Sequence, residues 1–250
     1  MIIGVDIGAS YIKSGIVSRN KIIKKVVLET GKNKKEVIDN IIKSIEVLFD
    51  KKIQGIGIGC PGPADYKKGI IRNSPNIPLN GVNIKKVISQ KFKKKVIIEN
   101  DADCFAIGES MRLKTKNLVG LTLGTGIGGG IIVDGKLLHG KGNAGHIGHS
   151  TIKFDGVQSK CGNNCVEKLY RDARASRKDF AKYLGIALAN INNILDPEVI
   201  SIGGGVSNTW DSFYKKMMEE FRKRTINKMP RVLKGAKYSG IIGVTSLFLS

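Results

Sequence analysis

The apolar positions in the first part of the chain change from strand spacing to helix spacing and back several times. Apolar runs bounded by polar or small residues predict strands, and apolar residues three and four positions apart predict helices. In chain order, the pattern predicts strands at 2–7, 11–18 and 21–28, a helix at 34–50, strands at 53–59 and 96–98 with a helix between them, and a helix at 102–113. This order predicts a mixed sheet flanked by helices.

The second part of the chain repeats this beginning and then becomes mostly helical. The predicted elements are two apolar strands from Leu118, a loop-rich stretch at 140–164, a mostly helical segment at 167–195, a strand at 199–202, an amphipathic helix at 209–225 and an apolar helix at 240–249. We therefore expect a smaller N-terminal α/β lobe over 1–113 and a larger C-terminal α/β lobe over 114–236. The terminal helix, at about 237–250, is expected to pack back on the first lobe.

One short pattern occurs twice along the chain. Residues 4–17 read GVDIGASYIKSGIV, and residues 120–133 read GLTLGTGIGGGIIV. An ungapped overlay matches Gly4 with Gly120, Ile7 with Leu123, Gly8 with Gly124 and Val17 with Val133. Each copy predicts a hairpin with a small-residue turn, and a second two-residue turn follows at Arg19-Asn20 and at Asp134-Gly135.

Turns with so few side chains let backbone N–H groups approach a ligand closely, and such groups suit an anion. The alternative is two ordinary hairpins with glycine turns. Because the two copies match, and because one carries Asp6 and the other Thr125, they favour a polyphosphate held between two lobes.

Composition narrows the class of protein without defining it. The 250 residues carry a formal net charge of +21, which is nearly all lysine in short groups spread along the chain. No helix-turn-helix segment, zinc-finger array or aromatic stacking platform accompanies this charge, so we expect solvated lysine faces and no nucleic-acid partner. No apolar segment approaches the roughly 20 residues that cross a bilayer, and the first residues lack the pattern of a secretion signal. We expect a cytoplasmic protein that does not enter membranes.

Taken together, these segments resemble the ROK family of sugar kinases, within the actin-like ATPase superfamily. The resemblance rests on residues 6–10 as a first phosphate loop, 57–63 and 74–76 as sugar-lobe turns, 99–103 as a catalytic segment, 123–128 as a second phosphate loop, 202–207 as an adenosine-binding turn, and 145–167 as a modified cysteine-rich signature. It implies an α/β, two-lobed actin-like ATPase (ribonuclease H-like) fold with duplicated mixed sheets flanked by helices.

The resemblance also implies an activity. We expect an ATP-dependent kinase that phosphorylates the 6-hydroxyl of a hexose or N-acylhexosamine, with Mg²⁺, as a homodimer. Two alternatives stay open. The short basic link at 171–177 replaces several dozen residues of typical members and resembles the polyphosphate glucokinase branch. The second alternative is a sugar-sensing protein with weak turnover. The presence of Asp101 argues against this alternative, and His146 argues for it.

Asp101 is the expected catalytic base, because it follows a predicted strand in the catalytic segment and a carboxylate can accept the proton of the attacked hydroxyl. It also suits the N-cap of helix 102–113, and the two roles are compatible. Asn100 can donate to and accept from sugar hydroxyls, and Asp103 is expected to be a charge that compensates the helix dipole.

The nucleotide contacts follow from the two loops and the third glycine turn. Asp6 can hold Mg²⁺ through water, since Mg²⁺ keeps several waters and needs few carboxylates. The expected ligands of the phosphates are Gly8, Ser10, Gly124, Thr125 and Gly126, and those of adenosine are Gly204 and Gly205.

The cysteine-rich signature implies zinc but is incomplete here. His149, Cys161 and Cys165 match three of its ligands, with Ser159 in place of a cysteine. Structural zinc takes four ligands, so His146 or Asp155 completes the set, or the metal is absent and the cysteines are reduced thiols. Cys60 and Cys104 are expected in the core.

The resemblance assigns the sugar contacts to Asn76, Asn100, Asp101, His146, His149 and Glu167. His146 stands where the family usually has a glutamate, which alters the hydrogen bonds offered to the sugar. We therefore expect a sugar preference that departs from the usual one.

Overall fold

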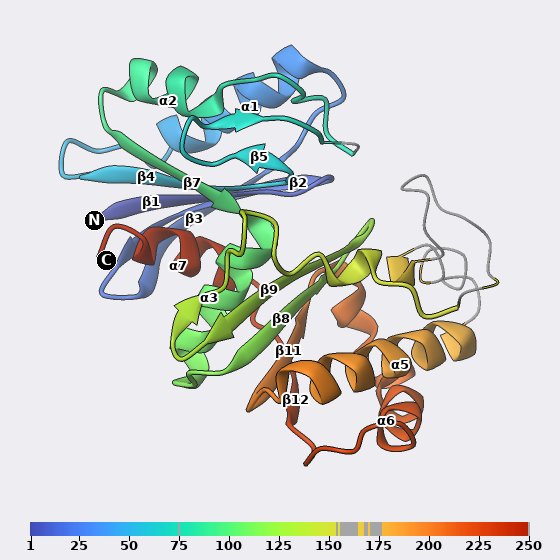
Figure 1. The fold of residues 1–250 in the computed structure, drawn as a ribbon. Coiled ribbons are helices and arrows are strands. Elements are labelled where there is room, and N and C mark those ends of the chain that lie inside the picture. Colours follow the sequence, from blue (N-terminus) through green and yellow to red (C-terminus); the bar gives the residue numbers. More distant parts are fainter. Residues whose placement is uncertain (75, 154, 156–164, 168–169, 171–176, 250) are drawn as a thin grey trace. The chain divides into compact units, whose positions relative to one another are not determined.

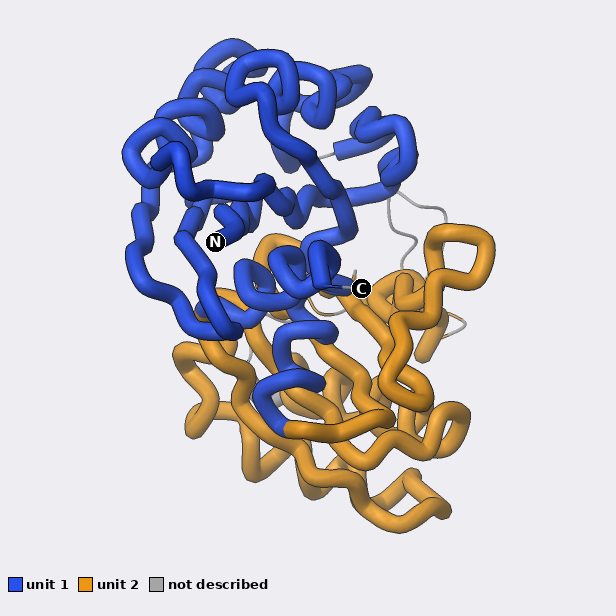
Figure 2. Tube along the Cα trace, turned by 90° about the vertical axis from the view of Figure 1, so that its left-hand side faces the viewer, with its two compact units in different colours: residues 1–113, 238–250 blue, residues 114–237 orange. Residues whose placement is uncertain are grey.

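The computed structural model describes residues 1–74, 76–153, 155, 165–167, 170 and 177–249. Within them the chain divides into two compact units (Figure 2), namely residues 1–113 with 238–250, and residues 114–237. No described helix is both long and apolar enough to cross a membrane.

Unit 1 is built on a mixed sheet with the strand order β3-β2-β1-β4-β7. Its elements are β1 (Ile2–Ile7), β2 (Tyr11–Ser18), β3 (Lys21–Glu29), α1 (Lys34–Glu46), β4 (Gly55–Cys60), β5 (Ala64–Asp65), β6 (Ile70–Ile71), α2 (Ile84–Phe92), β7 (Lys95–Asn100), α3 (Asp101–Leu113) and α7 (Ser239–Ser246). Strands β1, β4 and β7 run parallel, while β2 and β3 are antiparallel to their neighbours. Figure 1 shows α1 and α2 on one face of this sheet and α3 and α7 on the other.

Unit 2 repeats the same plan with the strand order β10-β9-β8-β11-β12. Its elements are β8 (Leu118–Leu123), β9 (Ile127–Val133), β10 (Lys136–Leu137), the 3-10 helix η1 (Ile147–His149), α5 (Arg177–Leu195), β11 (Val199–Gly203), the 3-10 helix η2 (Gly205–Ser212), α6 (Tyr214–Arg222) and β12 (Arg231–Lys234). Again an antiparallel hairpin joins a parallel set. The duplicated mixed sheets flanked by helices are therefore confirmed, and the C-terminal α7 belongs to unit 1.

The two hairpins are equivalent, but the ungapped overlay of their sequences is wrong after the turn. Ile7 pairs with Ile12 in the first hairpin, whereas Leu123 pairs with Ile127 in the second, whose turn is one residue shorter. Val17 pairs with Ile2, and the equivalent partner of Leu118 is Ile132 rather than Val133. The correct alignment therefore needs a one-residue gap at the turn.

The predicted second turns are confirmed by their backbone geometry. Arg19 and Asn20 have φ values of 49° and 61°, and Asp134 and Gly135 have 50° and 77°. Two consecutive residues with positive φ form the turn that suits a two-residue hairpin.

Two predicted helices end or begin elsewhere. Helix α1 begins where Asn33 accepts the amide of Glu36 at 3.0 Å, but it ends at Glu46 instead of 50. The helix expected over 209–225 is divided into η2 and α6, because Phe213 has φ −129° and ψ −18°. This backbone turn buries the Phe213 ring against Phe180, with ring centroids 5.0 Å apart, so packing overrides the amphipathic pattern.

Helices α3 and α7 lie so close together that side chains are excluded at their contact. A Cβ added to Gly108 would overlap the carbonyl oxygen of Ser239, and one added to Gly243 would overlap that of Cys104. At the same contact the Glu109 carboxylate, which is 0% exposed, accepts hydrogen bonds from Arg112 and Ser239. This contact anchors the C-terminal helix in unit 1.

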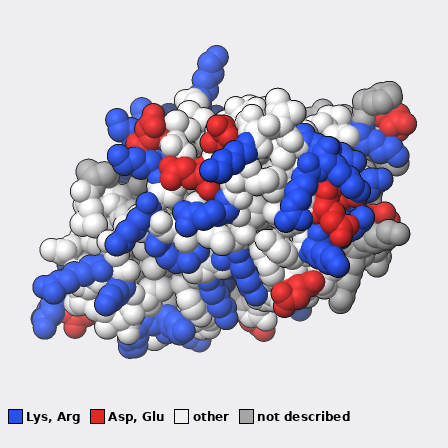
Figure 3. Space-filling model, turned by 90° about the horizontal axis from the view of Figure 1, so that it is seen from below, with Lys and Arg blue, Asp and Glu red and all other residues white. Residues whose placement is uncertain are grey.

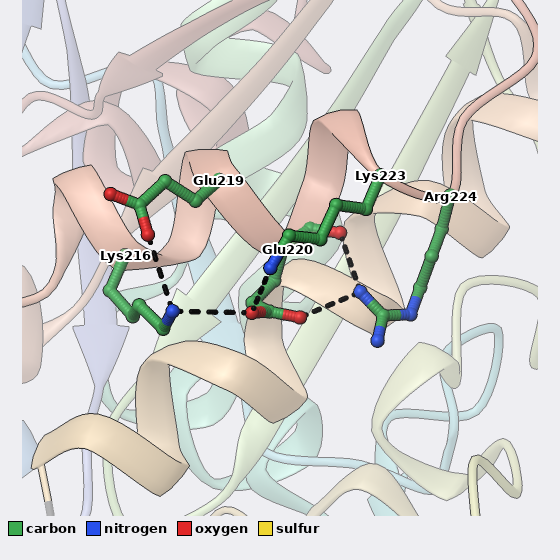
Figure 4. Close-up of polar contacts among 5 residues, drawn as sticks. All are labelled: Lys216, Glu219, Glu220, Lys223 and Arg224. Carbon is green, nitrogen blue, oxygen red and sulfur yellow. Dashed lines mark hydrogen bonds and ion pairs between the residues drawn. The ribbon is translucent and has the colours of Figure 1, made fainter.

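Surface charge is organised around a carboxylate on α6. Glu220 is 5% exposed, and Figure 4 shows it between Lys216, Lys223 and Arg224, with nitrogen–oxygen distances of 3.3, 3.0 and 2.7 Å. Hydrogen bonds from Lys223 and Arg224, and then from Lys216, lower the pKa of Glu220 to about 2. Elsewhere Lys and Arg are scattered in small groups over the face drawn in Figure 3.

The contact between α3 and α7 generates a stability prediction. We expect Gly243→Ala to lower the free energy of unfolding by about 1–3 kcal/mol, because the new methyl group must displace the Cys104 backbone. Gly240→Ala is the matched control on the same helix, since its Cβ would lie 3.7 Å from Asp6 Cγ in ordinary contact. Urea unfolding of the two variants compares them, and equal stabilities would contradict this packing.

The network at Glu220 generates a prediction about pH. The pKa of Glu220 lies below its ordinary value of 4.5, so its contribution to stability is complete above that pH and is lost as the pH falls toward about 2. We expect Glu220→Gln to be less stable than the wild type at pH 7, with a difference that narrows through this window. Glu219→Gln is the control, because the Glu219 side chain is 42% exposed and contacts Lys216 alone among the ion pairs of this network. A difference independent of pH would show that the carboxylate charge is not responsible.

Candidate active site

The first loop that the sequence analysis expects to bind phosphate, residues 8–10, joins β1 to β2 and is held by hydrogen bonds to the rest of unit 1. The Gly8 amide donates to the Tyr11 carbonyl at 3.1 Å. Thr30, 1% exposed, donates from its hydroxyl to the Gly8 carbonyl at 2.6 Å and from its amide to the Ser10 carbonyl at 3.0 Å. The loop carbonyls therefore bind Thr30, while Ser10 is exposed. We did not predict Thr30, because its partners lie about twenty residues away in the sequence.

Asp6 lies one residue before the end of β1, directly opposite Lys13 on β2. The Lys13 ammonium group is 3.1 Å from Asp6 Oδ2, and the two side chains are 29% and 21% exposed. This partly open carboxylate fits the expected magnesium ligand, since Mg²⁺ binds through few carboxylates and several waters. Lys13 was missed by the sequence analysis.

Asn100, and not Asp101, is the N-cap of α3. Asn100 Oδ1 accepts the amides of Ala102 at 2.9 Å and Asp103 at 3.2 Å, which are the usual donors to an N-cap side chain. Asp101 is the first residue of the helix, so the capping role expected for it is wrong. Because Asn100 Oδ1 caps the helix, its hydrogen bond with the Tyr66 side chain and any contact with a ligand are left to the Nδ2 donor.

The carboxyl group of Asp101 is tuned by its surroundings. Burial, followed by the negative charge of Asp6, raises its pKa to about 7, although the Ala102 amide and the Lys13 charge oppose this rise. A pKa near the working pH combines a useful fraction of carboxylate with adequate basicity. Asp101 is therefore chemically suited to accept a proton at neutral pH.

Asp103 does not have the role expected for it. It is 7% exposed, and burial together with Glu99 and Asp101 raises its pKa to about 8. A carboxyl group that is protonated at neutral pH cannot compensate the helix dipole. Its Oδ1 atom has no hydrogen-bond partner among the described residues.

Cys60 and Cys104 are both fully buried, as predicted, and burial raises the pKa of each thiol.

In unit 2, the second loop is held by two side chains from one segment. The Ile127 amide donates to Glu167 Oε2 at 3.0 Å, and the Tyr170 hydroxyl donates to the Gly124 carbonyl at 2.9 Å. A Cβ at Gly126 would overlap the Glu167 carboxylate, whereas no described residue lies within 4 Å of a Cβ at Gly124. Glu167 therefore contacts the loop that also carries Thr125. The Tyr170 side chain is 1% exposed.

The third glycine turn has two distinct parts. Gly204 has φ +86°, and a Cβ there would overlap the backbone of Leu123, so glycine is required by the fold. Among the residues that the structure describes, nothing lies within 4 Å of a Cβ at Gly205, where η2 begins. The open side of Gly205 is where a ligand can approach the backbone.

The expected sugar and zinc residues of unit 2 are only partly brought together. His146 and His149 are both exposed, with ring centroids 5.9 Å apart, and burial followed by His149 lowers the pKa of His146. Cys165 is 1% exposed, and its backbone forms an isolated antiparallel β-bridge with Thr151. Cys161 lies outside the described residues. Among the described residues, no group of three or more His, Cys, Asp or Glu side chains is placed to hold a metal ion.

In unit 1, the expected sugar ligand Asn76 is exposed on the turn after β6. That turn is braced by Asn80, whose Oδ1 accepts the Ser74 amide at 2.6 Å. Asn76 is thus available to a ligand.

Comparison with known proteins identifies the family. The family model described as "ROK family" matches residues 2–172 and 168–249. The glucokinase of Halalkalibacterium halodurans is 30% identical over 310 aligned positions, covering 96% of this chain and 92% of that protein. The N-acetyl-D-glucosamine kinase of Mannheimia succiniciproducens is 31% identical over 312 positions, covering 100% of both.

A solved structure agrees with these relatives. The ROK family glucokinase from Streptomyces griseus, in complex with glucose and AMPPNP, has a TM-score of 0.86 and 25% identity, covering 98% of each chain. The fold and its loops define a sugar kinase, a phosphotransferase with an alcohol acceptor. The chain belongs to the ROK family.

The assignment of the base can be tested at Asp101. We expect Asp101→Asn to lower kcat by about 10²-fold or more, because the amide cannot accept the proton, while sugar binding persists. In the wild type, kcat/KM should fall as the pH drops below about 7, where Asp101 becomes protonated. Asp103→Asn makes the same chemical change two residues away and should keep most activity. Comparable kcat values for Asp101→Asn and the wild type would rule out the assignment.

Proposed function

We propose that this enzyme transfers the γ-phosphoryl group of ATP to the 6-hydroxyl of a hexose or an N-acylhexosamine. The observation that carries the proposal is Asp101, which begins α3 beside Asp6 and whose pKa is raised to about 7. Glucokinase and N-acetyl-D-glucosamine kinase activities among the relatives support these two substrate classes.

The proposed chemistry is a single displacement. The Asp101 carboxylate accepts the proton of the sugar hydroxyl as its oxygen forms a bond to the γ-phosphorus, and the bond from that phosphorus to the ADP oxygen breaks. Asn100 orients the sugar through its Nδ2 donor, because its carbonyl oxygen caps α3. Asn76, His149 and Glu167 are further proposed sugar contacts.

His146 is the proposed determinant of sugar preference. Since its pKa is lowered, the imidazole is neutral at neutral pH and offers one donor and one acceptor. A glutamate at this position would be ionised and could only accept. The difference favours a sugar group that presents both a donor and an acceptor.

For the nucleotide, the proposed phosphate ligands are Ser10 in the first loop and Thr125 and Gly126 in the second. The Gly8 and Gly124 amides donate to the carbonyls of Tyr11 and Gly126 within their own turns, so these two glycines are proposed to leave room for the phosphates and not to donate to them. Gly204 and Gly205 are the proposed contacts of adenosine, with the open side of Gly205 available for its approach. Asp6 is the proposed ligand, through water, of Mg²⁺, which neutralises phosphate charge when bound. The homodimer and a zinc ion on His149, Cys161 and Cys165 stay predictions from the family resemblance, and the cytoplasmic location stays a prediction from the apolar pattern of the sequence.

Two features of the sequence favour a second phosphoryl donor. The chain has a net charge of +21, and its link at 171–177 is short and basic. A polyphosphate chain carries many negative charges that such residues attract, so polyphosphate is the alternative donor.

A coupled assay with two donors tests the function. We expect ATP to phosphorylate at least one of glucose, mannose, N-acetylglucosamine and N-acetylmannosamine, with Asp101→Asn as the inactive control. The 6-deoxy analogue of the best sugar should inhibit competitively without being phosphorylated, since it lacks the attacking oxygen. Turnover only with polyphosphate would select the alternative donor. Sugar binding without phosphorylation by either donor would identify a sugar sensor.

A further inference from the structure

The pair formed by Asp6 and Lys13 is set by the register of the hairpin. Directly opposite residues of an antiparallel pair point to the same face and have Cβ atoms about 4.5–5.5 Å apart. The Lys13 Nζ atom reaches Asp6 Oδ2 at 3.1 Å in this arrangement. A one-residue change of register would move Lys13 to the other face, so the pair depends on the turn at Gly8.

The Lys13 ammonium charge is only partly screened by solvent. The strand neighbours of this lysine, Ile12 and Ser14, point to the opposite face of the sheet, where they are 0% exposed. The Lys13 side chain itself is 29% exposed, so its interactions are screened less than those of a fully exposed lysine. Helix α7, which packs on β1 and β2, has the sequence SGIIGVTS and contributes no charged side chain.

We propose that Lys13 is a positioning residue for phosphoryl transfer, whose ammonium group fixes the Asp6 carboxylate through Oδ2 and balances the negative charge that Asp6 and Asp101 share. The inference rests on the proposed function, because the positioned groups are the proposed magnesium ligand and the base.

The charges that face Asp101 make this balance necessary. The groups that interact with it are Asp6 on β1, Lys13 on β2, the Cys60 thiol on β4, and Asp103 and the Cys104 thiol on α3, and Glu99 on β7 acts on the last three. Of these groups, Lys13 is the one that is positively charged. Its charge lowers the pKa of Asp101 against the effects of burial and Asp6. Without it, more of the base is protonated at neutral pH.

Fixing Asp6 also has a geometric consequence. An Asp side chain that is free to rotate presents its oxygens in several directions, and ordering it during the reaction costs entropy. With Oδ2 bound to Lys13, the position of Oδ1 is defined before any ligand arrives. Preorganised groups of this kind lower the reorganisation needed in the transition state.

The test compares Lys13→Met and Lys13→Arg with the wild-type full chain. We expect Lys13→Met to lower kcat by about tenfold or more, equivalent to at least about 1.4 kcal/mol in the activation barrier, to raise the Mg²⁺ concentration for half-maximal rate, and to move the acid limb of kcat/KM to higher pH. Lys13→Arg should restore most of the rate and the limb, because it keeps the charge. The control is Lys24→Met, which removes a lysine from β3 whose Nζ donates to the Val47 carbonyl.

A measurement without substrates completes the test. Carboxyl ¹³C NMR of the ligand-free protein should show Asp101 titrating at higher pH in Lys13→Met than in the wild type or in Lys24→Met. An active wild type whose Lys13→Met variant keeps both the rate and the titration would overturn the role of Lys13 while leaving the proposed function intact. A wild type inactive with every donor and sugar would overturn the proposed function and with it the positioning role of Lys13. A shifted titration would then identify the pair of Lys13 and Asp6 as an electrostatic contact alone.

Discussion

The close contact of α7 with the sheet and with α3 is the constraint on which the arrangement of unit 1 depends. A Cβ at Gly4 of β1 would lie 2.6 Å from the Ile241 carbonyl oxygen, and one at Gly57 of β4 would lie 2.9 Å from that of Val244. Since side chains are absent at these positions, the C-terminal helix approaches both strands through its backbone. The same helix brings Gly240 to within ordinary contact distance of Asp6 and of the Asp101 backbone, so a segment from the end of the sequence helps to enclose the proposed base.

Enclosing the proposed base places several carboxyl groups close together in a buried region, which is electrostatically unfavourable, and the positive charge of Lys13 opposes this effect locally. Glu99, Asp101 and Asp103 follow one another at alternate positions across the junction of β7 and α3. Burial and mutual repulsion raise the pKa values of Asp101 and Asp103, so these groups take up protons more readily than exposed carboxylates. The large positive charge of the chain does little here, because most lysines are exposed and screened by solvent. One partly buried lysine, Lys13, has more influence on the base than many surface lysines.

The duplicated hairpins show how one local structure supports two different contacts. Asp6 pairs with Lys13 in the first hairpin, while the equivalent pair in the second is Thr122 with Gly128, which carries no charge. The first loop is braced by Thr30 from β3's end, and the second by Glu167 and Tyr170. The shared backbone therefore presents loops of similar form, and the side chains around each loop give it a separate chemistry.

Features that depend on neighbouring residues were open to prediction from the sequence. Turn residues and apolar spacing determined the hairpins, most strands and the position of Asp101 after β7, because these preferences act within a few residues. Register, burial and helix caps are decided by contacts between distant segments. The pattern therefore missed the one-residue gap between the hairpins, the bracing by Thr30 and the break before α6, and it misassigned the cap of α3 and the charge of Asp103. Lys13 is the clearest case. The residues around it in the sequence predict only a position in a strand, and the pairing of β1 with β2 is what brings its ammonium group next to the Asp6 carboxylate.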